Sequence, residues 1–221
     1  MQFIAESFAE GGWMMWPILA VSILVWGIAV ERIIYLYFRA SVPTEAFLKT
    51  MEKAIVAGDL QRAIKLALMP NAPLGRIIHA GLAKIGKENN EVQAAIDEAA
   101  LRELPRIERR TAYLAMFGNV AMLLGLLGTI TGMIISFGAV ANADSSQRAA
   151  LLARGISEAM NCTAFGLITA IPALLFYAVL QGKTQKIVDD INEGSVRVLN
   201  LVLAHRDSLA KNVRSAESSE A

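Results

Sequence analysis

The segment Gly125–Gly138 reads GLLGTITGMIISFG and lies inside a run from Thr111 to Ala143 that contains no charged residue. A second charge-free run extends from Ala159 to Gly182. Each run exceeds the roughly 20 residues that a helix needs to cross about 30 Å of hydrocarbon. We therefore expect both runs to form helices that cross a membrane.

Small residues follow one face of each predicted helix, at spacings of three and four. In the first run these residues are Gly125, Gly128, Thr129, Gly132 and Ser136, and in the second they are Thr163, Gly166, Ala170 and Ala173. Such faces allow two helix backbones to pack closely. The segment between the runs contains the turn formers Asn142, Asp144, Ser145 and Ser146, so we predict an antiparallel hairpin.

Polar side chains inside this hairpin are the candidate functional residues. If the hairpin turns near Ser146, Thr129 and Thr163 lie at the same depth in the membrane. The alternative is that each hydroxyl only bonds a carbonyl three or four residues back in its own helix. Glu158 is a third candidate, because an ionisable group within or at the edge of a span is costly. Its alternatives are a place at the outer interface or an ion pair with Arg154, one turn earlier.

The composition bounds the classes of function. The 221 residues are 55% hydrophobic and 19% charged with a net charge of +1, which suits an integral membrane protein with a polar part. This balance gives no electrostatic basis for nucleic acid binding. The single cysteine, Cys162, and the absence of Walker, dinucleotide and zinc-ligand motifs predict no enzyme activity, no cofactor and no metal.

The rest of the chain also reads as helical. The uncharged run Gly11–Val30 has no basic start or cleavage site, so we predict a retained first span rather than a signal peptide, with Arg32 snorkelling at its inner boundary. The following loop is expected to hold four helices, and its boundaries are at Pro43, Gly58–Asp59, the turn Pro70–Pro73 and Asn89. The fourth helix is expected to run into the second span, with Pro105 as a kink or join.

We therefore predict an all-α polytopic membrane protein with three transmembrane helices, two of them extended into a cytoplasmic helical bundle. Most lysines and arginines lie in residues 41–110, whereas the N-terminus has none. The positive-inside rule then places the N-terminus in the periplasm and the C-terminus in the cytoplasm. The expected parts are an outer N-terminus and first span (1–40), a cytoplasmic loop (41–110), a second span (111–141), an outer turn (142–155), a third span (156–182) and a cytoplasmic helix and tail (183–221).

Two motifs in the hairpin resemble a known family. LGLLGTITGM at Leu124–Met133 and GISEAMNCTAFGLITAIP at Gly155–Pro172 are similar to the MotA/TolQ/ExbB proton-channel family. Three predicted spans and one large loop look like the ExbB/TolQ branch rather than the four-span MotA branch. The resemblance implies a subunit of an ion-driven motor in the bacterial inner membrane. It also implies a homopentamer around a dimer of single-span partners like ExbD or TolR, whose transmembrane aspartate takes up and releases protons.

The resemblance also implies roles for individual residues. Thr129 and Thr163 would line the ion path, with Glu158 as the glutamate of the last span. The motif positions Gly128, Gly132 and Pro172 are expected to pack the pore. Asn161 occupies a position where relatives carry small apolar residues, and it either adds a hydrogen bond in the pore or makes a helix–helix contact. The transported ion is expected to be the proton; a sodium-driven relative would be expected to carry more hydroxyls near the path.

The function that this resemblance implies is conversion of proton-motive force into mechanical work. The work would serve TonB-type uptake, Tol-type envelope maintenance, gliding motility or export, through a TonB/TolA-like or motility protein. One alternative is a structural membrane scaffold in which the polar hairpin only packs helices. A second is a stand-alone channel or transporter, which the lack of a mid-span acid and of an inverted repeat disfavours.

Overall fold

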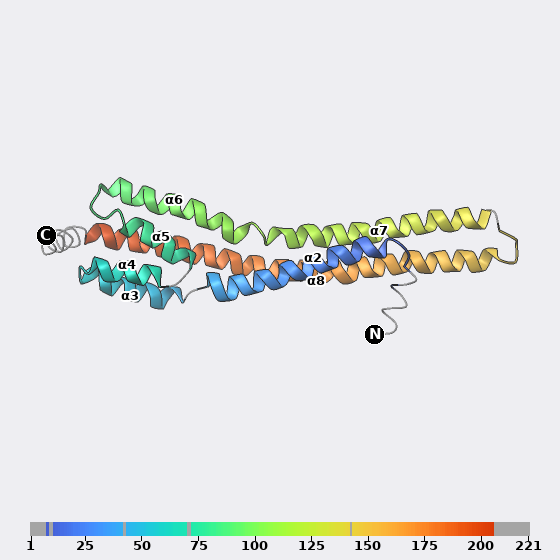
Figure 1. Cartoon of the computed structure of the whole chain (residues 1–221), viewed down its shortest axis with the longest axis horizontal. Helices are drawn as coiled ribbons and strands as arrows, with labels where there is room; N and C mark the ends of the chain where they lie inside the picture. Colours follow the sequence, from blue (N-terminus) through green and yellow to red (C-terminus); the bar gives the residue numbers. More distant parts are fainter. Residues whose placement is uncertain (1–7, 9–10, 42, 70–71, 142, 206–221) are drawn as a thin grey trace. The chain divides into compact units, whose positions relative to one another are not determined.

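The structure is a computed structural model that describes residues 8, 11–41, 43–69, 72–141 and 143–205. The described residues form helices joined by short turns (Figure 1). The helices are α2 (Met15–Ile34), the π-helix η1 (Tyr35–Ala40), α3 (Thr44–Val56), α4 (Leu60–Leu68), α5 (Pro73–Leu82), α6 (Asn89–Glu108), α7 (Ala112–Ala141) and α8 (Arg148–Ala204). The predicted turn residues Pro70, Asn71 and Asn142, and the tail from residue 206 onward, lie outside the described residues.

Three helical stretches are long and apolar enough to cross a membrane, judged by length and composition. They are Met15–Val56, Asn89–Ala141 and Arg148–Ala204. Their apolar parts are α2, α7 and the first part of α8, which are the three runs that the sequence predicted. The all-α fold class with three candidate spans is therefore confirmed.

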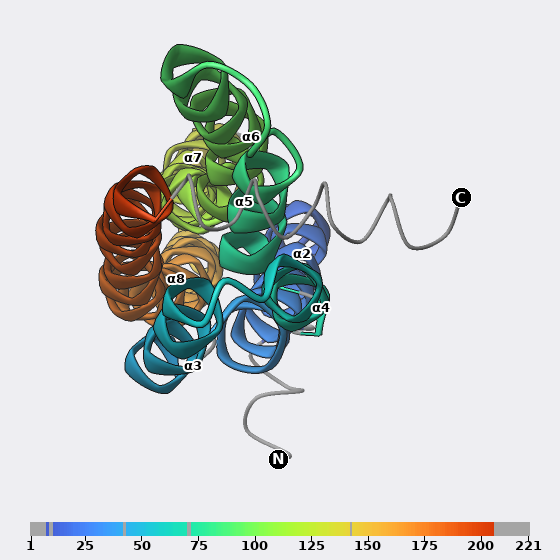
Figure 2. The ribbon, with the colours of Figure 1, turned by 90° about the vertical axis from the view of Figure 1, so that its left-hand side faces the viewer.

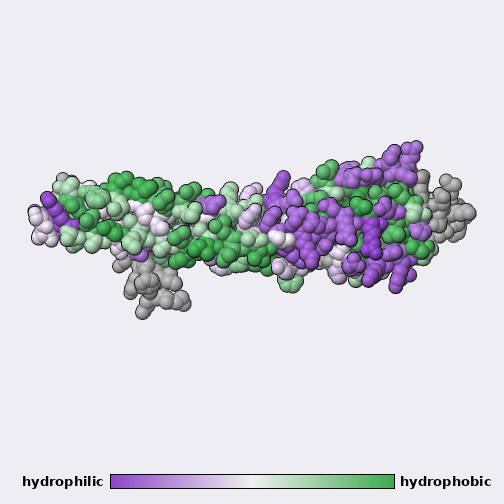
Figure 3. Space-filling view, turned by 180° about the vertical axis from the view of Figure 1, so that it is seen from behind, coloured by the Kyte–Doolittle hydropathy of each residue, from purple (hydrophilic) through white to green (hydrophobic). Residues whose placement is uncertain are grey.

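The chain divides into two compact units. The first, here called the apolar unit, comprises Met1–Arg32 and Arg110–Leu180, and the second, the polar unit, comprises Ile33–Arg109 and Gln181–Ala221. Hydrophobic side chains dominate the surface of the apolar unit, whereas hydrophilic side chains gather on the polar unit (Figure 3). Large exposed side chains such as Leu126, Ile130 and Ile171 suit contact with lipid or with another protein in a membrane.

The hairpin of α7 and α8 forms the centre of the apolar unit. Its buried α7 face consists of small residues with one leucine: Leu114, Gly118, Ala121, Gly125, Gly128, Gly132 and Ser136. Ala159, Cys162, Ala170 and Ala173 are buried on α8. The small-residue faces predicted from spacing therefore do pack against each other. Helix α2 adds an edge-to-face contact between Trp26 and Phe176, whose ring centroids are 5.5 Å apart.

Helix α8 is one continuous helix of 57 residues that includes Pro172. It begins at Arg148, so residues 148–155, which the sequence assigned to the turn, are helical. Before it, the Gln147 N–H bonds the Asp144 carbonyl at 2.9 Å and the Arg148 side chain bonds the Ala143 carbonyl at 3.0 Å. These local bonds close the turn within a few residues, and helical structure can start early.

The connection between α6 and α7 differs from the prediction of a kink at Pro105. Helix α6 continues past this proline, because the Arg109 N–H donates to the Pro105 carbonyl at 3.0 Å. The interruption comes at Arg109–Thr111, immediately before α7. Proline removes a donor toward the preceding turn but leaves its own carbonyl available, so the helix can continue for one further turn.

Arg32 is buried, which differs from the prediction that it snorkels. Its residue is only 2% exposed, and its Nε bonds the Glu31 carboxylate at 3.1 Å. Arg110 reaches the other oxygen of the same carboxylate, also at 3.1 Å. Glu31 thus bonds Arg32 through one oxygen and Arg110 through the other. Its negative charge offsets the cost of burying the Arg32 guanidinium.

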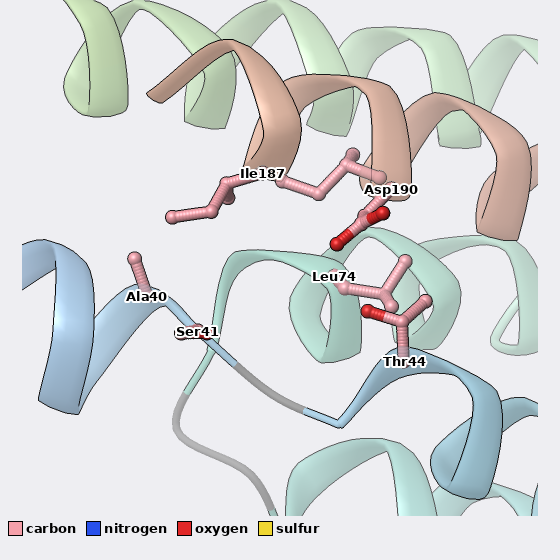
Figure 4. A pocket seen from close by; sticks show the side chains of 7 residues that line it. Ala40, Ser41, Thr44, Leu74, Ile187 and Asp190 are labelled. Carbon is pink, nitrogen blue, oxygen red and sulfur yellow. The ribbon is translucent and has the colours of Figure 1, made fainter. Parts of the chain in front are cut away.

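The polar unit is a bundle of short helices. Asp59 caps α4 by accepting a hydrogen bond from the Arg62 N–H at 2.9 Å. Helix α5 packs between α4 and α6, and Figure 2 shows this bundle end-on. A water-sized cavity of about 10 Å³ lies between Ser41, Thr44 and Asp190 (Figure 4). The core of this bundle includes the buried side chains Met51, Ile55, Ile77 and Ile78.

Candidate functional site

The candidate site is built on the close approach of α7 and α8. A methyl group added to Gly166 would lie 2.9 Å from the Ala121 carbonyl oxygen and 3.0 Å from Gly125 Cα. Both atoms belong to the α7 backbone and cannot move aside as a flexible side chain can. The two backbones are therefore in direct contact here, and glycine is the residue that permits it.

Three contacts fix the antiparallel register of the hairpin. Gly132 faces Ala159, Gly128 faces Cys162, and Gly125 faces Gly166. The seven-residue step from Gly132 back to Gly125 on α7 thus faces the seven-residue step from Ala159 forward to Gly166 on α8. Thr129 and Thr163 each follow one residue after the Gly128–Cys162 contact, in opposite directions along the axis. With a rise of about 1.5 Å per residue, the two threonines lie about 3 Å apart along the hairpin axis, which agrees with the predicted common depth.

The two threonine hydroxyls make different hydrogen bonds. Thr129 donates to the Leu126 carbonyl of its own helix at 2.6 Å, as the packing alternative expects. Thr163 instead donates across the hairpin to the Gly125 carbonyl at 3.2 Å. Both residues are half-buried. The pair can supply two acceptor oxygens to a polar group placed beside the hairpin.

Glu158 lies against the turn that precedes α2. Within the part of the chain that the structure describes, it forms no ion pair with Arg154 or any other cation, so the predicted pairing alternative has no support there. Its carboxylate packs beside Gly12 so closely that a methyl group on that glycine would overlap Oε1. Gly12 has a φ of +69°, a conformation that side chains with a Cβ rarely adopt. This contact was not predicted from the sequence, where the adjacent pair Gly11–Gly12 was the signal for a turn close to another segment.

Cys162 completes the connection between α8 and the start of α2. Its thiol donates to the Gly11 carbonyl at 3.0 Å. It also forms a hydrophobic cluster with Met14 and Met15, against which Phe8 and Phe165 pack. Because Met14 also approaches Gly128, the Gly128–Cys162 contact lies level with the beginning of α2. The two threonines therefore lie near that end of the first span rather than near its middle.

The remaining predicted residues surround this contact. Gly128 and Gly132 are buried in the α7–α8 contact, as packing residues should be. Asn161 is half-buried, and its side chain has no hydrogen-bond partner among the described residues. Pro172 is half-buried inside α8 and cannot donate a hydrogen bond to the Ile168 carbonyl. Asn161 and Pro172 are not among the residues that meet the α7 glycines.

The sequence of the hairpin and of the helices that precede it matches a known protein family. Residues 69–193, which include all of α7 and most of α8, match the sequence profile of the MotA/TolQ/ExbB proton channel family. The chain belongs to this family. The match contains both motifs of the hairpin and therefore the whole candidate site on α7 and α8. The resemblance predicted from the sequence is confirmed.

Named proteins are similar to this chain over between 43% and 85% of its length. A Synechocystis protein named "Putative biopolymer transport protein ExbB-like 1" is 33% identical over 80% of this chain and 70% of its own length. A Methanothermobacter thermautotrophicus protein named "Putative biopolymer transport protein ExbB homolog" is 30% identical over 85% of this chain and 66% of its own. The Haemophilus influenzae "Tol-Pal system protein TolQ" is 35% identical over 43% of this chain and 42% of its own.

Membership in the MotA/TolQ/ExbB family sets the class of function. The chain is a component of an ExbB/TolQ-family proton channel, a multi-pass membrane protein and not an enzyme. The ExbB/TolQ relationship also implies a partner of the ExbD/TolR type.

The contact of Glu158 with Gly12 leads to a prediction about stability. Gly12→Ala should destabilise the purified protein by about 1–2 kcal/mol, because the left-handed backbone conformation becomes strained and the carboxylate must move. Gly27→Ala is the matched control, since a methyl group at Gly27 in α2 meets nothing within 4 Å. Thermal unfolding in detergent would measure both. A Gly12→Ala protein as stable as the Gly27→Ala protein would contradict the described contact.

Proposed function

We propose that this chain is the proton-conducting stator subunit of a motor in the bacterial inner membrane. It forms a homopentamer around a dimer of single-span ExbD/TolR-like partners and converts proton-motive force into mechanical work. The observation that carries the proposal is the placement of Thr129 and Thr163 at one level of a tightly packed hairpin. Both residues are half-buried, and a hydroxyl that donates one hydrogen bond can still accept another.

The titratable group of the proton relay comes from the partner. The runs Thr111–Ala143 and Ala159–Gly182 contain no carboxyl group, while a proton relay across a membrane needs one that can change its charge. An aspartate on the partner's single helix supplies it. The threonine pair then offers hydroxyls to this aspartate in both of its protonation states. Glu158, one to two turns from Thr163, is held at the same end of the site by the Gly12 turn.

The energy for movement comes from the charge cycle of that aspartate. A unit charge that crosses the whole membrane potential gains about 2.3 kcal/mol per 100 mV. Protonation weakens the attraction between the aspartate and the polar ring that five copies of Thr129 and Thr163 form. Because this pair lies level with the first turn of α2, the partner's aspartate must lie toward the same end of the membrane. Rotation of the partner within the ring is the resulting motion.

The arrangement in the membrane follows the distribution of charge. The N-terminus and the hairpin turn lie in the periplasm, and residues 41–110 and the segment from 183 onward lie in the cytoplasm, in keeping with the positive-inside rule. Three similar proteins carry the name of a putative biopolymer transport protein of the ExbB type, which supports a TonB-type uptake process over Tol-type maintenance, gliding motility or export. A TonB-like protein would carry the motion onward.

Co-purification tests the composition of this assembly. The full chain would be extracted in a mild detergent from cells that express its natural neighbours and weighed by native mass spectrometry. The proposal predicts five copies of this chain with two copies of a single-span protein that carries a membrane aspartate. A ring that lacks such a partner in every preparation would favour the structural scaffold.

A further inference from the structure

An arginine-lined cavity in the polar unit takes no part in the proposed proton path. It has a volume of about 280 Å³ and is lined by Tyr35, Arg39, Pro73, Arg76 and Arg106. These residues come from three separate segments, η1, α5 and α6. Three guanidinium groups around one cavity repel one another unless an anion lies among them.

One protein carboxylate partly neutralises this cavity. Glu103 is 5% exposed and accepts a hydrogen bond from Arg76 at 2.6 Å and another from Arg106 at 2.8 Å. Arg39 forms no ion pair with any residue that the structure describes. Among the described ion pairs at the cavity, Arg76 and Arg106 therefore share one carboxylate, and Arg39 keeps an uncompensated positive charge.

The helix whose N-terminus lies at the cavity adds to the positive potential of the cavity. Helix α5 begins at Pro73, has no acidic residue in its first turn, and its N-cap residue Ala72 provides no side-chain hydrogen bond. Its N-terminal end therefore carries the partial positive charge of an uncompensated helix dipole. Arginine groups presented together with a helix N-terminus form the kind of site that binds phosphate oxygens.

The position of the cavity along the chain places it beside lipid headgroups. Helix α2 has 20 residues, which correspond to about 30 Å, the thickness of the hydrocarbon layer. Tyr35 and Arg39 follow within the next five residues and so fall in the headgroup layer. Around them, Ile34, Tyr37 and Phe38 expose 55%, 49% and 82% of their surface, as apolar anchors at a membrane boundary do.

We propose that this cavity binds the phosphate headgroup of an anionic phospholipid. Arg39 and Arg106 contact the phosphate oxygens, Arg76 is held in place by Glu103, and the exposed Tyr37 and Phe38 lie against the acyl chains. The site would anchor η1, α5 and α6 to one leaflet, where they can support the helices that cross the membrane. This inference does not depend on proton conduction.

The test uses the full chain purified in a mild non-ionic detergent. Bound phosphatidylglycerol and phosphatidylcholine would be counted by native mass spectrometry during titration with each lipid. The wild type should bind phosphatidylglycerol more tightly than phosphatidylcholine. Arg39→Gln should weaken phosphatidylglycerol binding about fivefold, and Arg39→Gln with Arg106→Gln about thirtyfold. Glu103 keeps its bond to Arg76 in both variants, so its burial is preserved.

Two controls separate the site from general attraction to charge. Arg39→Lys keeps the charge and should keep most of the binding. Arg62→Gln removes an exposed arginine of α4 that does not line the cavity, and it should bind phosphatidylglycerol as the wild type does. An equal loss in Arg62→Gln, or equal binding of the two lipids by the wild type, would overturn the proposal.

A second arm of the experiment, with a soluble ligand, distinguishes a lipid from a free phosphate. Inorganic phosphate at millimolar concentration would be added in place of lipid, and the unfolding temperature would be measured. Stabilisation of the wild type but not of the double variant, without any lipid preference, would overturn the lipid assignment and give the site to a soluble phosphate. If inorganic phosphate reduces phosphatidylglycerol binding only weakly, the result would support the lipid headgroup.

Discussion

Replacement of both Thr129 and Thr163 by valine should abolish the energised process in cells while the protein is made and assembled normally. Valine keeps the shape of threonine and replaces its hydroxyl with a methyl group. Two membrane hydrogen bonds of about 0.6–1.7 kcal/mol each correspond to a loss of about tenfold or more in rate. The measurement is energised uptake in cells whose chromosomal copy carries the double substitution, with the amount of protein determined in parallel.

The structure supplies a control for this experiment. Thr131 also lies on α7 and donates to the Leu127 carbonyl at 2.9 Å and the Gly128 carbonyl at 3.2 Å, both in its own helix. It is two residues from Thr129 and therefore on another face. Thr131→Val should leave uptake unchanged. If the double variant instead transports normally, or loses assembly rather than transport, the hydroxyls serve packing and the scaffold alternative is correct.

Gly166→Ala should loosen the hairpin and reduce the yield of assembled protein. The added methyl group would meet the backbone of α7 at Ala121 and Gly125, and overpacking of this kind costs about 1–3 kcal/mol. Gly182→Ala on the same helix is the control, because a methyl group there meets nothing within 4 Å. That substitution should stabilise the helix by up to about 1 kcal/mol. Thermal unfolding of the two purified variants should therefore shift in opposite directions.

A Gly166→Ala protein that unfolds at the wild-type temperature would contradict the close α7–α8 contact. It would also remove the basis for the hairpin register, since the Gly125–Gly166 approach is one of the three contacts that define it. The common level of Thr129 and Thr163 would then need independent support.

The hairpin could be predicted because its information is local. Two charge-free runs and the spacing of Gly125, Gly128 and Gly132 were enough to give the spans, their antiparallel packing and the shared depth of the threonines. The cap at Asp59 and the helix start at Pro73 were also visible as short-range signals. Such features depend on residues within a few turns of each other, and a single sequence displays them directly.

Features that depend on packing between distant segments were not predictable. The apolar residues of α2 do not mark the level at which this helix meets the hairpin, so the contact of Met14 with Gly128 and that of Gly12 with Glu158 went unseen. The same applies to the hydrogen bond that Arg110 donates to the distant Glu31. The arginine cavity combines three segments that no sequence spacing connects.

In the proposed motor, this chain conducts protons only together with a partner that supplies the titratable aspartate. The most direct measurement is proton flux into liposomes that contain a pH-sensitive dye and carry a potassium diffusion potential. We expect flux with the co-purified complex, and no flux with the chain alone, with the Thr129→Val and Thr163→Val double variant, or with the partner's aspartate changed to asparagine. Proton flux through the chain alone, or undiminished flux through the complex carrying the double variant, would contradict the proposed motor.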